Sequence, residues 1–254
     1  MNDVIKTLLQ HRSHRQYKKE ATIPTQHMQM ILDAACQAPS WLNGQHYSII
    51  RITDSKLRQM ITDHQPFNPQ IGECSEFLIF IADGYRSYLD SQAYDGSFAA
   101  IGTPDTVFTL TVDAALAAQN ATIAAEALGY GTCDIGGIRL IAAELIEWLK
   151  LPKYTFPLFG LCIGVPEDNT QIKPRIPQQS VVFENQYGSE EQVNRDLADY
   201  EQTMQTFAEE RESKPYRQKM SDYYSHSFAP QNNTLLRQQG FLTHPDGLPE
   251  DQQA

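Results

Sequence analysis

The sequence predicts an α+β fold with few strands and long helices. Residues 47–53 and 77–82 are rich in β-branched and aromatic residues, a composition typical of strands. Residues 105–128 consist almost only of Ala, Val, Leu, Ile, Phe and Thr, and a run of this length predicts a long buried helix. After about residue 170 the apolar segments give way to a sequence rich in Gln, Asn, Glu, Asp and Tyr.

The other elements follow from the spacing of apolar residues and from the residues that begin and end helices. Four shorter helices are expected, over residues 3–10, 24–37, 55–62 and 139–149. Segment 131–137 is expected as a strand or a loop, and the apolar segment 158–165 as a second buried strand. Helical spacing resumes near Glu190 and continues to Phe207.

Asp113 and Glu126 are the only charges inside the long helix. At about 1.5 Å per residue the helix spans about 36 Å, the diameter of a domain. A helix that is apolar on all sides is expected to be buried on all sides. It is therefore either central to a large core or half covered by another subunit. Gly129 is expected to end it.

Composition excludes several classes of protein. The chain has 254 residues and a formal net charge of −11, which argues against a broad nucleic-acid surface. No stretch approaches the roughly 18 apolar residues of a membrane span, and the N-terminus has no signal-peptide pattern. Four scattered cysteines, Cys36, Cys74, Cys133 and Cys162, are expected as buried thiols of a cytoplasmic protein rather than as disulfides or zinc ligands.

The first candidate for ligand binding is His11-Arg12-Ser13-His14-Arg15, which follows the first helix. Guanidinium, hydroxyl and imidazole groups this close together can bind an anion, and the forked Arg donors suit a phosphate or a ring carbonyl. A solvated helix end, with Arg complementing the helix dipole, is the competing interpretation. A metal at His11 and His14 is not expected, because no carboxylate or Cys accompanies them locally.

Three further segments have suggestive patterns. Loop 39–45 supplies donors and acceptors that suit the edge of a heterocycle, although its Asn-Gly alone favours an ordinary turn. The glycines of 129–137 let backbone N–H groups approach a ligand, but the pattern is neither a Rossmann fingerprint nor a P-loop. Lys173-Pro174-Arg175 is either a phosphate clamp or a charged linker. No nucleophile signature occurs, so a cofactor is expected to supply the reactivity.

Taken together and in order, these segments resemble the nitroreductase / NADPH-flavin oxidoreductase family, in its oxygen-insensitive major nitroreductase and flavin reductase branch. The segments that carry the resemblance are 11–15, 48–54, 113–129, 135–139, 157–164 and 173–177. The resemblance covers about residues 3–207 well and the C-terminal tail loosely.

The resemblance implies a nitroreductase-like fold, with a central, mostly antiparallel sheet flanked by long helices. It also implies an intertwined homodimer that binds FMN at its interface, with the long helix in the dimer core. Residues 1–185 would form the FMN-binding core. Residues 186–254 would form a C-terminal helical extension that clasps the dimer.

The resemblance also assigns roles in FMN binding to the cationic segments. The phosphate would be held by His11, Ser13, Lys173 and Arg175. Arg12 would help along the ribityl chain. Arg15 would face the N1/C2 carbonyl edge of the isoalloxazine, where negative charge develops on reduction, and is the residue expected to act in catalysis.

Other positions would line the ring. Ser40 and Gln45 fall at its pyrimidine edge. Backbone N–H groups near N5 and O4 would come from Ile135, Gly136 and Gly137. Asp134 stands where an aromatic residue usually precedes them. Asn68 falls where the family usually has a Gln for the ribityl chain or the ring, and Gln65 is the competing choice.

The implied activity is FMN-dependent oxidation of NADPH or NADH, with transfer of two electrons to nitroaromatics, quinones or free flavin in a ping-pong mechanism. Trp41 would stand near the open flavin face. The tail has Ser227-Phe228-Ala229-Pro230 where relatives have an Arg-Pro pair that helps to bind the NADPH 2′-phosphate. This leaves Arg139, Arg211 and Arg217 as candidates. A non-catalytic flavin-binding or sensing protein of the same fold is the alternative.

Overall fold

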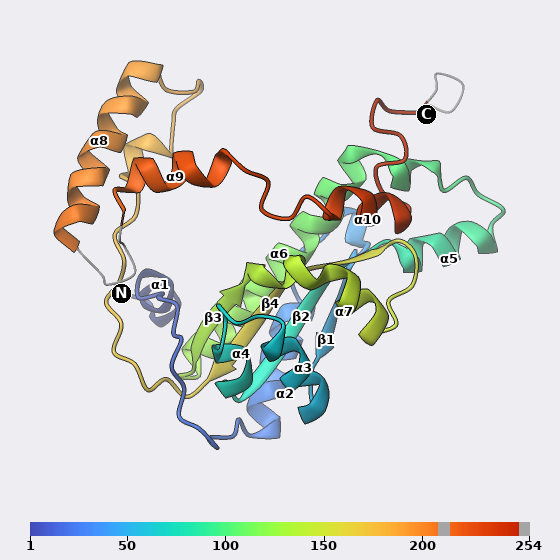
Figure 1. The fold of residues 1–254 in the computed structure, drawn as a ribbon, viewed down its shortest axis with the longest axis horizontal. Coiled ribbons are helices and arrows are strands. Elements are labelled where there is room, and N and C mark those ends of the chain that lie inside the picture. The colour runs from blue at the N-terminus through green and yellow to red at the C-terminus, as the bar shows by residue number, and fades with distance from the viewer. Residues whose placement is uncertain (208–213, 249–254) are drawn as a thin grey trace. The chain divides into compact units, whose positions relative to one another are not determined.

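The computed structural model describes residues 1–207 and 214–248. Its centre is a four-stranded antiparallel sheet in the order β1-β2-β4-β3 (Figure 1). The strands are β1 (Tyr47–Arg51), β2 (Glu76–Asp83), β3 (Gly131–Ile135) and β4 (Thr155–Gly164). The predicted α+β class and the expected antiparallel sheet are confirmed.

Seven α-helices within residues 1–170 surround the sheet. They are α1 (Asp3–Leu9), α2 (Thr25–Cys36), α3 (Ser55–Asp63), α4 (Gln70–Glu73), α5 (Tyr85–Ala93), α6 (Pro104–Ala127) and α7 (Ala142–Trp148). The helix expected over 139–149 is divided, because a 3-10 helix at Gly136–Ile141 precedes α7. The short helices α4 and α5 were not expected from apolar spacing.

Helices cover both faces of the sheet. On one face, α2 and α6 pack through Ile31 and Ala117 against Leu78 and Phe80 of β2. The other face carries a second hydrophobic core, in which Phe77 of β2 is clustered with apolar residues of α3, α4 and α7. Every residue of β2 is buried, as expected for a strand with helices on both sides. The continuous apolar run of this strand is explained by that position.

The long helix α6 is buried on one side only. Its sheet-facing residues include Leu110, Ala114 and Ala121, but Phe108 is 68% exposed and Val112 is 55% exposed. A single chain therefore does not bury all sides of α6, and the expected alternative, cover by another subunit, stays a prediction. On α1, four further apolar side chains are exposed, namely Val4, Ile5, Leu8 and Leu9. The described residues do not cover these apolar side chains.

The chain divides into two compact units. The first comprises residues 1–170 and the segment from Gln231 onward, which contains α10 (Asn232–Gln238). The second comprises residues 171–230, with α8 (Glu190–Phe207) and α9 (Tyr216–Tyr224). Residue 185 falls inside this second unit, and the division expected at that residue stays a prediction.

Two further sequence expectations concern cysteines and membranes. Cys74, Cys133 and Cys162 are buried as expected, but Cys36, the last residue of α2, is exposed. Among the helices of the described residues, none is both long and apolar enough to cross a bilayer.

Candidate functional site

The 11–15 segment lies along the edge of the sheet. It follows α1 directly, and Ser13 forms a parallel bridge to Thr132 of β3. The backbone N–H of His14 donates to the Thr132 carbonyl over 2.8 Å. Because β3 is the last strand of the sheet, its outer edge has backbone groups available for this pairing. The sheet thus fixes the backbone of the cationic segment.

Glu126, near the C-terminal end of α6, holds the side chains beside that segment. Its Oε1 accepts from the Thr132 hydroxyl at 2.6 Å and lies 2.7 Å from His11 Nδ1. The Glu126 side chain is only 12% exposed. A buried carboxylate requires such partners, and here they are a threonine of β3 and the first residue of the cationic segment.

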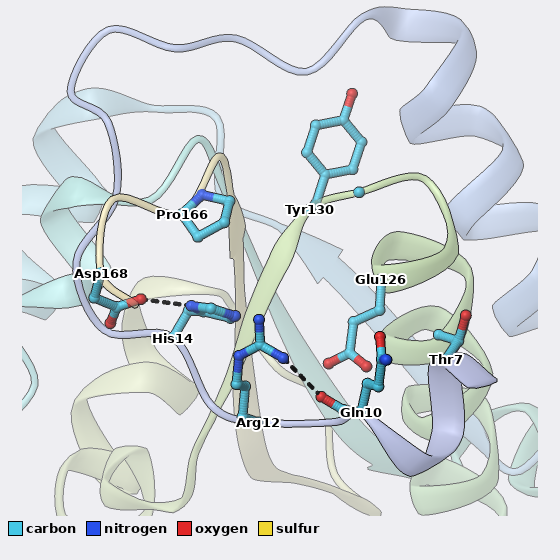
Figure 2. A pocket seen from close by; sticks show the side chains of 9 residues that line it. Thr7, Gln10, Arg12, His14, Glu126, Tyr130, Pro166 and Asp168 are labelled. Atoms are coloured by element: carbon cyan, nitrogen blue, oxygen red, sulfur yellow. Dashed lines mark hydrogen bonds and ion pairs between the residues drawn. The ribbon is translucent and has the colours of Figure 1, made fainter. Parts of the chain in front are cut away.

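Figure 2 shows the cavity of about 250 Å³ next to this network. Its walls are formed by Thr7, Gln10, Arg12, His14, Glu126, Gly129, Tyr130, Pro166 and Asp168. Arg12 Nη1 donates to the Gln10 carbonyl over 3.1 Å. Arg12 Nε is shielded from solvent and has no hydrogen-bond partner within the part of the chain that the structure describes.

Asp168 closes the other side of the 11–15 segment. Its carboxylate lies 2.5 Å from His14 Nδ1 and accepts the backbone N–H groups of Arg15 at 2.9 Å and Gln16 at 3.2 Å. Burial raises the pKa of Asp168, but these hydrogen bonds favour the charged form more strongly, so the pKa lies below its usual value. Sequence patterns did not indicate Asp168, because it stands alone in a loop far from its partners along the chain.

Gln65 and Asn68 both lie against Gly137. A Cβ at position 137 would lie 2.5 Å from Gln65 Oε1 and 2.6 Å from Asn68 Nδ2, so a larger residue there would displace the two amides. Asn68 Nδ2 also donates to Gln65 Oε1 over 3.1 Å. The structure therefore places the two competing candidates side by side at the diglycine.

The diglycine follows β3 directly and begins a 3-10 helix. Ile135, the last residue of β3, is buried, and Gly136 is the first residue of the helix. The first N–H groups of a helix have no partner within it, so they are available to a ligand. Asp134 points to solvent, yet the surrounding protein atoms raise the pKa of its carboxyl; nearby His11 opposes this effect and Glu126 adds to it.

The 40–46 loop is fixed to the other interior carboxylate of α6. Asp113 Oδ1 accepts the backbone N–H of Trp41 at 3.0 Å, and Oδ2 accepts that of His46 at 3.2 Å. Ser40 Oγ accepts the backbone N–H of Gln45 at 3.0 Å. Trp41 is 64% exposed. Ser40 and Gln45 therefore belong to one ordered loop, as expected.

The two loops are held at different places along α6. Asp113 and Glu126 are separated by about 20 Å along the helix axis at about 1.5 Å per residue. The predicted site residues in the 11–15 segment and in the 40–46 loop are thus held by two different carboxylates of α6. Glu126 holds the 11–15 segment, and Asp113 holds the 40–46 loop.

The remaining cations have local partners. Lys173 is half-buried and Arg175 is exposed, and Arg175 Nη1 donates to the Lys173 carbonyl over 2.6 Å within the second unit. Arg217, in the same unit, donates from Nη2 to Asn194 Oδ1, and Arg139 donates from Nη1 to the Leu158 carbonyl. Arg211 lies outside the described residues.

Metal ligands are not grouped in the structure. Over residues 1–207 and 214–248, no three His, Cys, Asp or Glu side chains are placed to hold a metal ion. His11 and His14 instead pair with separate carboxylates, those of Glu126 and Asp168. What the geometry offers is a set of hydrogen-bond donors for an anionic ligand.

An antiparallel sheet between helices, with cationic and glycine-rich segments at its edge, defines a class of α+β proteins that hold an anionic ligand beside the sheet. Comparison with known families is more specific. A family model described as "Nitroreductase family" matches residues 8–165, and one described as "Nitroreductase family, C-terminal domain" matches residues 173–244. The chain belongs to the nitroreductase family, and it is an oxidoreductase of that family.

Curated relatives match over nearly the whole chain. The FMN reductase [NAD(P)H] of Bacillus subtilis is 35% identical, and the alignment covers 95% of this chain and 98% of that protein. The NADPH-flavin oxidoreductase of Vibrio harveyi is 37% identical, over 84% of this chain and 85% of that protein.

Solved structures agree with this assignment. The hypothetical oxidoreductase YcnD from Bacillus subtilis has a TM-score of 0.91 and 35% identity, covering 95% of this chain and 98% of that chain. The NADPH:FMN oxidoreductase from Vibrio harveyi complexed with NAD+ has a TM-score of 0.86 and 31% identity, covering 95% of this chain and 100% of that chain. The nitroreductase-like fold is therefore established.

Proposed function

We propose that the protein is an FMN-dependent NAD(P)H oxidoreductase that reduces nitroaromatics, quinones or free flavin by a ping-pong mechanism. Relatives named FMN reductase and NADPH-flavin oxidoreductase support this function. The observation that carries it is the arrangement at the end of β3, where Gly137, Gln65 and Asn68 meet. Amide side chains and helix-start N–H groups beside a glycine suit the polar edge of a flavin ring.

The residues present fit FMN in two respects. A Cβ at Gly137 would fall on the two amides, so the glycine lets both amides approach the backbone at this point. Arg12 Nε is buried and has no partner among the residues that the structure describes, and a buried donor of this kind is costly unless a ligand satisfies it. A phosphate or ribityl oxygen is an acceptor that this nitrogen would bind.

The phosphate would be held by His11, Ser13, Lys173 and Arg175. Glu126 fixes the His11 ring through Nδ1, and the bridge to Thr132 fixes the backbone of Ser13. Fixed donors lose little conformational entropy on binding an anion, which increases affinity. Arg12 would contribute along the ribityl chain.

The ring would lie between the other predicted residues. Arg15 would place a cation at the N1/C2 edge, where negative charge develops on reduction, and Ser40 and Gln45 would contact the pyrimidine edge. Asn68 and Gln65 would reach the ribityl chain or the ring. The strand end Asp134-Ile135 and the glycines Gly136 and Gly137 would lie near N5 and O4. When bound, FMN supplies the electron-transfer chemistry, and the protein supplies positioning and electrostatics.

A second copy of the chain would complete the site. The anchors of the 11–15 segment and the 40–46 loop are about 20 Å apart along α6, which supports contributions from two chains to each flavin. The exposed Phe108, Val112 and Leu116 of α6, with the apolar surface of α1, give the area that a homodimer would bury. The C-terminal residues would clasp this dimer.

The nicotinamide donor would approach the open face of the flavin near Trp41. Arg139, Arg211 and Arg217 are the cations proposed for the NADPH 2′-phosphate. Three buried cysteine thiols are consistent with a cytoplasmic protein, which we propose as the compartment.

Stopped-flow mixing of the FMN-loaded protein with NADPH and with NADH, under anaerobic conditions, tests the function. Bleaching of the flavin absorbance by either donor, followed by recovery on addition of a quinone or a nitroaromatic, is the expected result. If neither donor bleaches the flavin, the oxidoreductase proposal fails and the non-catalytic flavin-binding alternative replaces it.

The division of roles between cations is tested separately. Arg15→Ala is expected to slow flavin reduction at least about tenfold while FMN retention falls less, because its charge acts on the reacting ring. The double change Lys173→Ala and Arg175→Ala is expected to release FMN, because both contact the phosphate. Stopped-flow reduction and the dissociation constant of FMN give the two readouts. Equal effects of both variants on both readouts would contradict this division.

A further inference from the structure

Asp113 is a buried carboxylate whose hydrogen bonds all go to one loop. It is 1% exposed in the middle of the apolar helix α6. Besides the backbone N–H groups of Trp41 and His46, it has His46 Nδ1 2.8 Å from Oδ2. Backbone bonds at both ends of a loop fix its path as well as its end points. The helix therefore determines the conformation of the 40–46 loop.

That conformation is one the loop would not keep unaided. Leu42, Asn43 and Gln45 have φ angles of 51°, 56° and 48°, in the left-handed region that costs free energy for residues other than glycine. Arg86 holds the end of the loop by donating to the carbonyls of Gln45 and Tyr47. A strained loop of this kind persists only where surrounding groups fix it.

The loop places Trp41 between two hollows of the surface. One, of about 400 Å³ in the single chain, is apolar and is bordered by Trp41 and by Phe108, Val112 and Leu116, which lie on the face of α6 that the proposed second copy would cover. The other, of about 230 Å³, is bordered by Trp41 together with His46 and Phe98. Because the indole borders both spaces, its position sets the size of each.

We propose that Asp113 is a positioning residue for the electron acceptor. By fixing the 40–46 loop it holds Trp41 as the wall between the two hollows, and this wall limits the size of the aromatic acceptor. The inference rests on the proposed function, in which this loop lies at the flavin. It concerns acceptor size, whereas the proposed function concerns the reaction itself.

Hydrogen exchange of the purified, FMN-loaded protein tests the anchoring without any measurement of activity. In Asp113→Ala, the amides of Trp41 and His46 are expected to exchange at least about tenfold faster, because both lose a charged acceptor. Asp113→Asn keeps one oxygen but presents an NH₂ group to the other loop end, so only one of the two amides should lose protection. This variant keeps the test available if the alanine variant does not fold.

Asn120→Ala is the matched control. Asn120 is another polar residue of α6, and its side chain donates to the Ala34 carbonyl over 3.0 Å rather than to the loop. Its loss should leave the exchange of Trp41 and His46 unchanged.

Steady-state kinetics with 1,4-naphthoquinone and 1,4-benzoquinone test the selection of acceptor size. The ratio of the two kcat/KM values is expected to rise at least about fivefold in Trp41→Ala, through a lower KM for the larger quinone. It should move in the same direction in the Asp113 variants and stay constant in Asn120→Ala.

Unchanged exchange in the Asp113 variants would overturn the anchoring. A proportional loss of activity toward both quinones would show a merely structural role and overturn the proposal. If the wild-type protein oxidises neither NADPH nor NADH, the proposed function fails and the acceptor role fails with it. Hydrogen exchange then still decides whether Asp113 holds the loop.

Discussion

The two interior carboxylates of α6 differ in what they hold. Asp113 accepts the backbone N–H groups of Trp41 and His46, so it determines the conformation of a loop. The Glu126 carboxylate is hydrogen-bonded to two side chains, those of Thr132 and His11, so it orients groups whose backbone the sheet already fixes. The difference shows that one apolar helix can position two parts of a site in different ways. Loss of Asp113 should damage the fold more, and loss of Glu126 should damage ligand binding more.

The largest expected effect is that of Asp113→Ala on stability. Two partly buried backbone N–H groups lose a charged acceptor, and each such group costs about 1–3 kcal/mol, so the free energy of unfolding should fall by about 3 kcal/mol. Urea denaturation of the purified protein measures this change. Asn120→Ala removes one hydrogen bond from the same helix and should cost about 1 kcal/mol. If the free energy of unfolding falls equally in the two variants, Asp113 contributes no more to stability than another polar residue of the same helix.

A smaller effect on stability is expected from Glu126→Gln, with its main effect on the ligand. The amide keeps an oxygen for Thr132 but loses the charge that faces His11, so FMN retention should weaken about tenfold, or about 1.4 kcal/mol. Fluorescence of released FMN measures the dissociation constant. Glu147→Gln, on the exposed side of α7, changes the net charge equally and should have no effect. An equal effect of both variants would indicate general electrostatics instead.

The smallest effect is expected at Asp168, on the opposite side of the 11–15 segment from Glu126. Its pKa in the folded protein is below the usual value, so its stabilising contribution is present above pH about 3.9 and is lost as the pH falls through the folded pKa. Asp168→Asn should therefore cost about 1 kcal/mol at pH 7 and progressively less below pH about 3.9. Urea denaturation from pH 3 to 7 follows this difference. A difference that does not depend on pH would contradict the role of the charge.

Much of the fold could be predicted from the sequence because it depends on local patterns. The apolar run of β2 and the composition of α6 predict their own structure. At the start of α3, Asp54 is a local helix cap that accepts from the N–H groups of Lys56 and Leu57. The short helices α4 and α5 were missed because an element of one or two turns leaves little periodicity to detect. Whether the chain itself or a second copy covers the apolar face of α6 could not be decided from the sequence, because both arrangements require the same apolar residues.

The site divides in the same way. The cationic 11–15 segment, the 40–46 loop and the diglycine were recognised from their composition and order, and the family to which they point is confirmed. Their roles toward FMN stay predictions. The choice between Gln65 and Asn68 could not be made from spacing, since α4, β2, α5, α6 and β3 separate both residues from Gly137 along the chain. The structure brings both to that glycine.

The sequence by itself determined the α+β class, the family and the presence of two charges inside an apolar helix, because these depend on residue type and order along the chain. Only the tertiary structure decided what those charges hold. Asp113 meets residues 41 and 46, and Glu126 meets residue 11, across separations that no local pattern encodes. The pairing follows from how the helices pack on the sheet, since a buried carboxylate must find its partners wherever packing brings them.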